Sequence, residues 1–311
     1  MTSSTNNYLT HNLLMVPPSC FAFNTETGID NEFQHKINAT DVELKEKAKS
    51  EFDNMVAKLK DFGANVVVFD AEQDNTPDAV FPNNWFSTDV TGNLYLYPMA
   101  CENRQREVKP AQLVRFLEAE NFNVKNVIDV RSLAVDNAKL EGTGAMVFDH
   151  VNDTVYAAIS QRCNRVLLEQ CVQRLDMNDV VAFDTHLPSG NAIYHTNVML
   201  SVGTDYAIVC SESIASDHRE QVLNSLSDKN LIDISFEQLN AFCGNVLQIT
   251  NKDGKKGLAM SLTAYHAFTP EQRQMLEKSG ELLPFDVTTI ESVGGGSVRC
   301  MLAEIFLPSR F

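Results

Sequence analysis

Apolar and polar residues alternate along the chain at two spacings, and each spacing predicts a different kind of element. Between residues 41 and 63, apolar side chains recur every three or four positions, as on the buried face of a helix. Gly63 suits the end of that helix, because glycine readily adopts the left-handed conformation found there. Residues 65–70 follow as a short run rich in valine, which is typical of a strand. The sequence thus predicts a helix followed at once by a strand.

This alternation continues along the whole chain. Helical spacing also predicts helices at residues 110–120, 163–174, 215–225 and 270–278. Short apolar runs predict strands at residues 93–97, 124–130, 145–148, 154–159, 180–183, 198–202, 207–210, 233–236, 246–250, 258–261 and 285–289. No linker rich in Gly, Ser or Pro divides these elements, and no repeat is visible in the sequence. We therefore predict one α/β domain over residues 12–311, after a polar tail at residues 1–11 that we expect to be disordered.

Composition and charge narrow the classes of partner. The 311 residues are 44% hydrophobic and 21% charged, which is ordinary for a globular protein that needs no disulfides to hold its core. The formal net charge of -16 repels nucleic acid and anionic lipid, so we expect neither a nucleic-acid nor a membrane partner. The same charge would attract a cationic substrate, although it equally serves solubility.

Cysteine usage and the start of the chain indicate a compartment. The seven cysteines are dispersed, odd in number and without a CxxC pair, which predicts neither a disulfide framework nor a zinc site. The first residues lack the apolar core of a signal peptide, and no apolar run approaches the roughly 20 residues that span a bilayer. We therefore expect a cytoplasmic protein.

The sharpest local feature is a run of three glycines that leads to Cys300, within residues 291–306. We expect the glycines to leave a strand and to bend the chain so that the cysteine is held at a fixed angle. Nearby N–H groups, or the neighbouring Arg299, would stabilise its thiolate. A buried, inert cysteine is the alternative for Cys300 and the interpretation we adopt for the other six. A phosphate loop is excluded, because no Gly-Lys-Ser/Thr follows the glycines.

Two residues are candidates for the proton transfers that a cysteine nucleophile needs. His195 follows a turn and opens an apolar run, so we expect it at a strand end facing a cavity. Glu141 lies between a leucine and two glycines just before a predicted strand, where it could be presented at a sheet edge. A hydrogen-bonded scaffold histidine and an exposed turn acid are the corresponding structural alternatives. The segment 78–89 is also unusual, because it holds the only tryptophan and the paired amides Asn83 and Asn84, although paired Asn also marks simple turns.

Together these motifs resemble one enzyme superfamily. Their order is an Asx-rich segment, then Glu-Gly-x-Gly, His-x-Asn and Gly-Gly-Gly-x-x-x-Cys. It is similar to that of arginine deiminases, dimethylarginine dimethylaminohydrolases and glycine amidinotransferases, and most similar to arginine-deiminase-related citrulline-utilisation hydrolases. The resemblance extends from about residue 13 to residue 306. It implies a five-bladed α/β propeller, the pentein fold, built from ββαβ-type modules around a central active site.

The resemblance also implies a chemistry. Cys300 would attack the central carbon of a guanidino or ureido group, His195 would act as acid and base, and Glu141 would orient the histidine. No metal or organic cofactor is implied. The implied reaction is hydrolysis of a C–N bond of a guanidino or ureido amino acid with release of ammonia. An amidinotransferase using the same adduct and a non-catalytic guanidine-binding relative are the alternatives, and a homo-oligomer is compatible with the sequence.

The chain departs from the superfamily pattern where the substrate would bind. Asn84, with Asn83 beside it, and Asn197 stand where deiminases carry aspartates. An amide binds a planar N–C–N group without supplying negative charge, which favours a neutral ureido group. A succinylarginine-hydrolysing branch nevertheless uses asparagine with a guanidine substrate. An arginine expected in the first strand is replaced by residues 16–18, and the candidates for a substrate carboxylate are Arg104, Arg106, Arg162 and Arg299, each of which could instead form a surface salt bridge.

Overall fold

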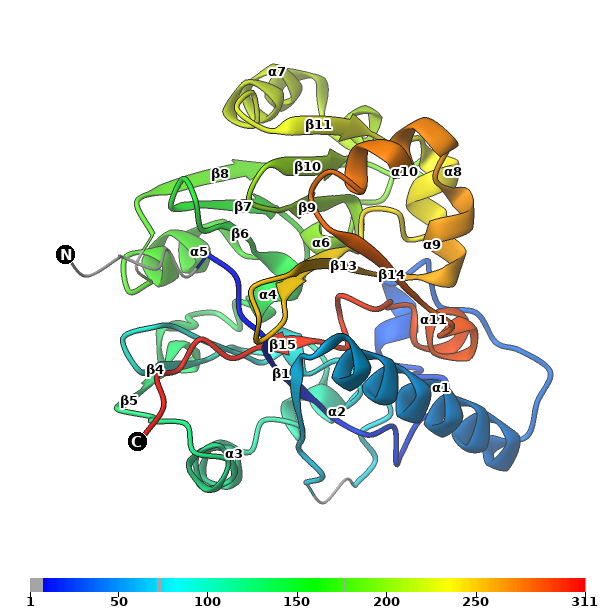
Figure 1. Ribbon diagram of the computed structural model, residues 1–311. Helices are drawn as coiled ribbons and strands as arrows, with labels where there is room; N and C mark the ends of the chain where they lie inside the picture. The colour runs from blue at the N-terminus through cyan, green and yellow to red at the C-terminus, as the bar shows by residue number, and fades with distance from the viewer. Residues whose placement is uncertain (1–7, 72–73, 176, 311) are drawn as a thin grey trace.

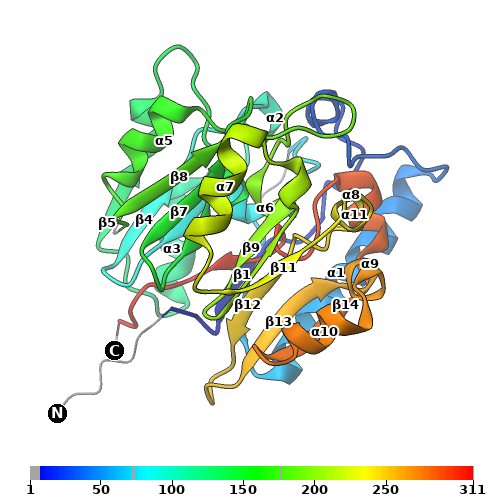
Figure 2. The ribbon, with the colours of Figure 1, turned by 90° about the horizontal axis from the view of Figure 1, so that it is seen from above.

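A computed structural model describes residues 8–71, 74–175 and 177–310. Within them the strands form five separate three-stranded sheets. The sheets surround a common centre, and helices such as α1 (Asp41–Phe62), α3 (Pro110–Ala119) and α7 (Ser216–Ser225) lie at the outside (Figures 1 and 2). The predicted five-bladed α/β arrangement is confirmed, in a propeller-like form without a closed barrel.

Each sheet is built to one plan. Its middle strand pairs antiparallel with the strand before it and parallel with the strand after it. In the first sheet, β4 (Asn93–Leu96) lies between β3 (Phe86–Thr88) and β5 (Asn126–Asp129). A parallel pair needs a long crossover, and here α2 (Glu102–Gln105) and α3 supply it.

Three further sheets repeat this plan, and the fifth joins the two ends of the chain. In the fifth sheet, β1 (Asn12–Met15) pairs antiparallel with β15 (Ala303–Glu304) and parallel with β2 (Asn65–Val68), with α1 as its crossover. The other sheets and their crossover helices are β6 (Val147–Asp149), β7 (Thr154–Ala158), α5 (Arg165–Val172) and β8 (Asp179–Phe183); β9 (Leu200–Val202), β10 (Tyr206–Val209), α7 and β11 (Asn230–Asp233); and β12 (Leu247–Thr250), β13 (Lys256–Ser261), α9 (Leu262–Ala267), α10 (Pro270–Leu276) and β14 (Glu281–Phe285).

Helix α1 shows why the periodic segments fold as predicted. Thr40 and Glu43 form a reciprocal capping box at its start, and Gly63 ends it with a left-handed φ of 96°. Its apolar positions are buried against the fifth and fourth sheets, and they are Leu44, Ala48, Phe52, Met55 and Leu59. Burial of this face is the main source of the helix's stability.

Three predicted strands are displaced because a helix forms over part of each. Strand β14 ends at Phe285, and α11 (Thr288–Gly294) follows where a strand at 285–289 was predicted. The Glu51 carboxylate on α1 accepts the backbone N–H groups of Thr289 and Ile290 at 2.8 and 3.0 Å, which caps α11.

The other two displacements also involve short helices. A capping box between Ser235 and Gln238 starts α8 (Phe236–Asn240) inside the strand predicted at 233–236. Helix α6 (Thr196–Met199) takes up the first part of the strand predicted at 198–202, and β9 forms from the rest.

The first described residues are held by two distant segments, the residue that follows β15 and the last residue of β12. Thr10 is buried, its hydroxyl donates to the Ile305 carbonyl at 2.8 Å, and its carbonyl accepts the Thr250 N–H at 3.2 Å. Residues 1–7 of the predicted tail lie outside the described residues. Among the helices of residues 8–71, 74–175 and 177–310, none has the length and apolar character to cross a bilayer.

Candidate active site

A short turn precedes the first strand of every sheet, and these five turns carry the candidate residues. In three sheets the turn is a short helix: η2 (Pro82–Asn84) before β3, α4 (Gly142–Ala145) before β6, and α6 before β9. In the remaining two sheets it is irregular, at residues 241–246 before β12 and 297–302 before β15. α4 packs against both η2 and α6. The candidate positions are therefore structurally equivalent, although no repeat is visible in the sequence.

Four of the turns hold the residues predicted from the sequence. Asn84 ends η2, Glu141 is the N-cap of α4, His195 is the N-cap of α6, and Cys300 lies in the turn before β15. His195 therefore starts a short helix and does not stand at a strand end, although it faces a cavity as predicted, and Glu141 starts the short helix that precedes β6. The three glycines likewise leave a helix, α11, and Gly295 ends it with a left-handed φ of 66°.

His195 and Glu141 form a buried pair. The His195 Nε2 atom lies 2.8 Å from Glu141 Oε2, and Glu141 Oε1 accepts the Ala100 N–H at 2.8 Å. Burial alone would raise the pKa of Glu141, but the Arg162 guanidinium, 3.5 Å away, and the His195 hydrogen bond outweigh it and hold that pKa well below its usual value. Glu141 is therefore an acceptor only, so His195 carries its hydrogen on Nε2.

The other ring nitrogen of His195 points to the side where Asn84 lies. A methyl group on Gly144 would stand 2.8 Å from His195 Nδ1 and 2.3 Å from Asn84 Nδ2, so both groups would have to move. Gly144 thus lets α4 approach both groups closely. Burial lowers the pKa of His195, against the opposing effect of Glu141, so the imidazole is neutral near pH 7 and presents a free Nδ1 lone pair.

Cys300 is buried, and two side-chain amides face its sulfur. Asn245 Nδ2 lies 3.3 Å from Sγ and Asn197 Nδ2 lies 3.5 Å from it. The turn that carries Cys300 is fixed by Glu291, which accepts the Ser297 hydroxyl at 2.6 Å, and by Tyr194, whose hydroxyl donates to the Gly295 carbonyl at 2.5 Å. Asn245, from the fifth of the equivalent turns, was not predicted, because its local sequence resembles an ordinary Gly-Asn turn.

One cavity brings Cys300 and His195 together. It is also lined by Asp78, Asn84, Arg104, Arg162, Tyr194 and the three glycines. Two of these residues have a buried atom without a protein partner, Asp78 Oδ1 and Asn84 Nδ2. A buried polar atom is costly to leave unsatisfied, so the cavity offers one acceptor and one donor to a ligand.

Asp78 was overlooked in the sequence although it opens the segment that contains Asn83 and Asn84. Its Oδ2 atom accepts hydrogen bonds from Asn24 at 2.7 Å and Thr27 at 2.9 Å, which leaves Oδ1 for the cavity. Burial raises the pKa of Asp78, against the opposing effect of Arg104. An acid three residues before a buried phenylalanine was the only local signal.

Comparison of the sequence with known protein families gives one match. The sequence profile described as "N,N dimethylarginine dimethylhydrolase, eukaryotic" matches residues 17–307. The chain belongs to this family. The family lies within the guanidino-modifying pentein superfamily, so the resemblance seen in the sequence is confirmed. No curated protein matches the chain.

Solved structures show the same fold at low identity. ArgZ, an arginine dihydrolase of the ornithine–ammonia cycle in cyanobacteria, has 16% identity and a TM-score of 0.74 over 96% of this chain. The match covers 41% of ArgZ, so this chain spans well under half the length of that protein. The N-terminal domain of ArgZ with bound substrate has 17% identity and a TM-score of 0.73, and the match covers 95% of this chain and 99% of that domain. The DDAH of Pseudomonas aeruginosa with citrulline has 14% identity and a TM-score of 0.64, and the match covers 96% of this chain and 99% of that protein.

Of the four arginines predicted to bind a substrate carboxylate, two line the Cys300 cavity, Arg104 and Arg162. Arg104 forms a buried pair with Glu107 at 2.9 Å and donates to Asn84 Oδ1 at 2.7 Å, which turns the Asn84 Nδ2 group toward the cavity. Arg162 is also buried and is held by both oxygens of Asp30. Asn83 donates to Thr143 at 3.2 Å and does not line the cavity.

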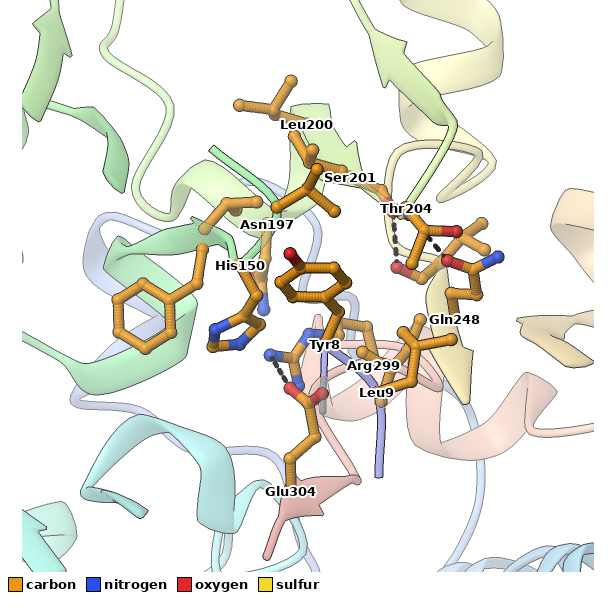
Figure 3. A pocket seen from close by; sticks show the side chains of 17 residues that line it. Tyr8, Leu9, His150, Asn197, Leu200, Ser201, Thr204, Gln248, Arg299 and Glu304 are labelled. Atoms are coloured by element: carbon orange, nitrogen blue, oxygen red, sulfur yellow. Dashed lines mark hydrogen bonds and ion pairs between the residues drawn. The ribbon is translucent and has the colours of Figure 1, made fainter. Parts of the chain in front are cut away.

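The predictions of Arg299 and Arg106 as substrate residues are wrong in position. Arg299 pairs with Glu304 at 3.0 Å and lines a second cavity that also holds His150 and the far side of Asn197 (Figure 3). Its backbone adjoins Cys300, but its side chain runs the other way. Arg106 is half exposed, pairs with Glu102 at 2.8 Å and lies outside the lining of the Cys300 cavity. Within the described residues, no three His, Cys, Asp or Glu side chains gather in a way that could hold a metal ion.

The acid limb of the pH profile tests the state of His195. Because burial lowers the pKa of His195 from its ordinary value of 6.5, the base form persists to a lower pH than in a free histidine. For the reaction proposed below, we expect the midpoint of the acid limb of kcat/KM to lie below pH 6.5. A midpoint clearly above pH 6.5 would contradict a neutral His195 in the free enzyme.

Proposed function

We propose that the protein is a hydrolase that cleaves a C–N bond of a guanidino or ureido amino acid through a covalent adduct on Cys300. The observation that carries this proposal is the hydrogen-bonded pair His195–Glu141 facing the same cavity as Cys300. A nucleophile, a base and a group that orients the base are the parts that covalent catalysis requires. Family membership supports the same reaction class.

The first half of the reaction forms the adduct. The Cys300 thiol gives its proton to His195 Nδ1, and the thiolate adds to the central carbon of the guanidinium, moving an electron pair onto nitrogen. His195 then returns the proton to the departing nitrogen, the C–N bond breaks and ammonia leaves. A thiouronium group remains bonded to Sγ, and the ionised Glu141 stabilises the imidazolium that forms in between.

The second half hydrolyses the adduct. His195 Nδ1 removes a proton from water, and the hydroxide adds to the same carbon. The C–S bond breaks, which regenerates the thiolate and leaves a ureido product. A ureido substrate would follow the same steps to a carbamate, which decomposes to an amine and carbon dioxide. The reacting carbon must therefore remain reachable by water after ammonia has left.

Substrate recognition follows from the charges of the cavity. Asp78 Oδ1 would accept hydrogen bonds from a cationic group of the substrate, and Asn84 Nδ2 would donate to it or to a ureido oxygen. Arg104 and Arg162 are the arginines that line the cavity, and a substrate carboxylate would have to share them with Glu107 and Asp30, which already pair with them. The substrate bound by the domain of ArgZ, an arginine dihydrolase, and the citrulline bound by DDAH support a guanidino or ureido ligand.

A substrate screen with the Asn84→Asp variant tests both the class and the role of the neutral amide. Ammonia release is measured for arginine, citrulline, agmatine, methylarginines and N-succinylarginine. An aspartate at position 84 replaces a neutral amide that lines the cavity with a carboxylate, which makes the cavity more negative. We expect the ratio of kcat/KM for arginine over citrulline to rise about tenfold, which corresponds to about 1.4 kcal/mol.

The controls keep the outcomes apart. Asn54→Asp adds the same charge on the exposed face of α1 and should leave the ratio unchanged. If Asn84→Asp changes both substrates in parallel, the neutral amide does not set preference. If no compound releases ammonia unless an acceptor amine is added, the protein is an amidinotransferase and the hydrolase proposal fails.

A further inference from the structure

We propose that Asn245 is a further catalytic residue, which donates a hydrogen bond to the Cys300 thiolate and fixes the position of the sulfur. This inference rests on the proposed function, because it assigns Asn245 a part in the same site. Nothing in the local sequence distinguishes Asn245. Its role becomes visible only when the turn before β12 is seen to occupy the same position as the turns that carry Asn84, Glu141 and His195.

The orientation of the Asn245 amide is set by three contacts. Its Oδ1 atom accepts the backbone N–H of Arg299 at 3.0 Å, and its Nδ2 atom donates to the Asn197 carbonyl at 2.8 Å. The side chain is fully buried. Nδ2 lies 3.3 Å from Cys300 Sγ and Oδ1 lies 3.7 Å from it, so a protonated thiol can donate to Oδ1. A thiolate has no hydrogen, so the amide must be the donor once Cys300 is ionised.

Close packing of the turn against α6 makes this contact reachable. A methyl group on the preceding residue, Gly244, would lie 2.3 Å from the Val198 carbonyl oxygen. Only glycine allows the two backbones to approach so closely. The same approach places Asn245 beside Asn197, whose own Nδ2 lies 3.5 Å from the sulfur. The Cys300 sulfur therefore contacts two amides, Asn197 from the turn before β9 and Asn245 from the turn before β12.

A neutral donor suits the proposed substrate. A buried thiolate needs hydrogen-bond donors, because burial otherwise penalises its charge. A lysine or arginine in contact with Sγ would supply them but would repel a guanidinium that must reach the same atom. Two amides stabilise the thiolate and leave the sulfur as a centre of negative charge that attracts the substrate cation. As the thiolate attacks, its charge moves to the substrate and then to the leaving nitrogen.

Asn245 could instead only support the fold. Alkylation of Cys300 in the free enzyme distinguishes that structural role from donation of a hydrogen bond to the thiolate. Iodoacetamide is a neutral probe that reacts with the thiolate, so the pH dependence of Cys300 labelling, followed by peptide mass spectrometry, reports its ionisation without any substrate. We compare the unaltered protein with Asn245→Ala, which removes the donor, and Asn245→Asp, which keeps an acceptor for the Arg299 N–H. Asn240→Asp, exposed at the end of α8, matches the added charge.

Loss of the donor should shift ionisation upward. We expect the midpoint of Cys300 labelling to move to higher pH by about one unit in Asn245→Ala and further in Asn245→Asp, where a carboxylate faces the thiolate. We expect kcat to fall about 10- to 100-fold with little change in KM. Asn240→Asp should match the unaltered protein.

Two failures are distinguishable. If Cys300 in the unaltered protein is no more reactive than the other cysteines, the proposed function itself fails. If Cys300 is selectively labelled but both Asn245 variants keep its labelling midpoint, only the role of Asn245 is refuted. A variant that unfolds would expose all seven cysteines to the reagent, so Asn245→Asp, which preserves shape, decides when Asn245→Ala is unstable.

Discussion

Replacing Cys300 with alanine is expected to abolish ammonia release, with turnover at least about 10⁴-fold below that of the unaltered protein. The reason is that the adduct cannot form without the thiolate, and the remaining groups of the cavity have no other nucleophile to activate except water. The measurement is ammonia release from the best substrate of the screen, at saturating concentration. Alanine fills less space than cysteine and leaves the turn before β15 free of strain, so the fold should persist.

A matched cysteine variant guards this result. Cys171, on α5, is buried among apolar residues and lies outside the cavity, so Cys171→Ala should keep nearly full activity. Substantial turnover by Cys300→Ala, beyond a trace, would refute the nucleophile assignment. Equal losses in both variants would indicate a general effect on folding, which thermal unfolding would reveal.

Replacing His195 with glutamine is expected to lower kcat by about 10² to 10⁴, the range measured for loss of a general acid–base group. Glutamine can still donate to Glu141 but cannot carry a proton between the thiol, the leaving nitrogen and water. The measurement is again ammonia release. His266→Gln, at an exposed position on α9, is the control and should behave as the unaltered protein.

A change of leaving group separates catalysis by His195 from a structural contribution. A substrate analogue that expels a thiolate instead of ammonia needs no protonation of the leaving atom. His195→Gln should therefore release the thiolate from such an analogue at a rate much closer to that of the unaltered protein than its rate of ammonia release. An equal loss with both substrates would mean that His195 acts by shaping the site.

Sequence patterns predicted the elements whose formation depends on neighbouring residues. Helix α1 has a clear apolar face and good caps, and it was placed correctly. The region after Phe285 was placed wrongly, because α11 depends on a cap from Glu51, more than 200 residues away along the chain. A cap that comes from a distant helix leaves no signal in the neighbouring residues.

Some residues of the site could likewise be predicted from the sequence, and others could not. Cys300, His195 and Glu141 could be selected from the sequence because glycines and a family resemblance surround them. Arg299 was misplaced because its neighbour Cys300 faces the opposite cavity, and one-dimensional proximity does not give direction. Asp78 and Asn245 were overlooked because their importance depends on which atoms remain unpaired, or face the sulfur, once the five turns converge.

The most direct test of the central claim is the mass of Cys300 during turnover. The unaltered protein and His195→Gln are mixed with substrate, quenched in acid and digested. We predict a Cys300 peptide heavier by the substrate minus ammonia, most abundant when water activation is impaired in His195→Gln. Active protein whose Cys300 peptide never carries this mass in either form, while ammonia is released at the normal rate in the unaltered protein, would contradict a covalent mechanism on this cysteine.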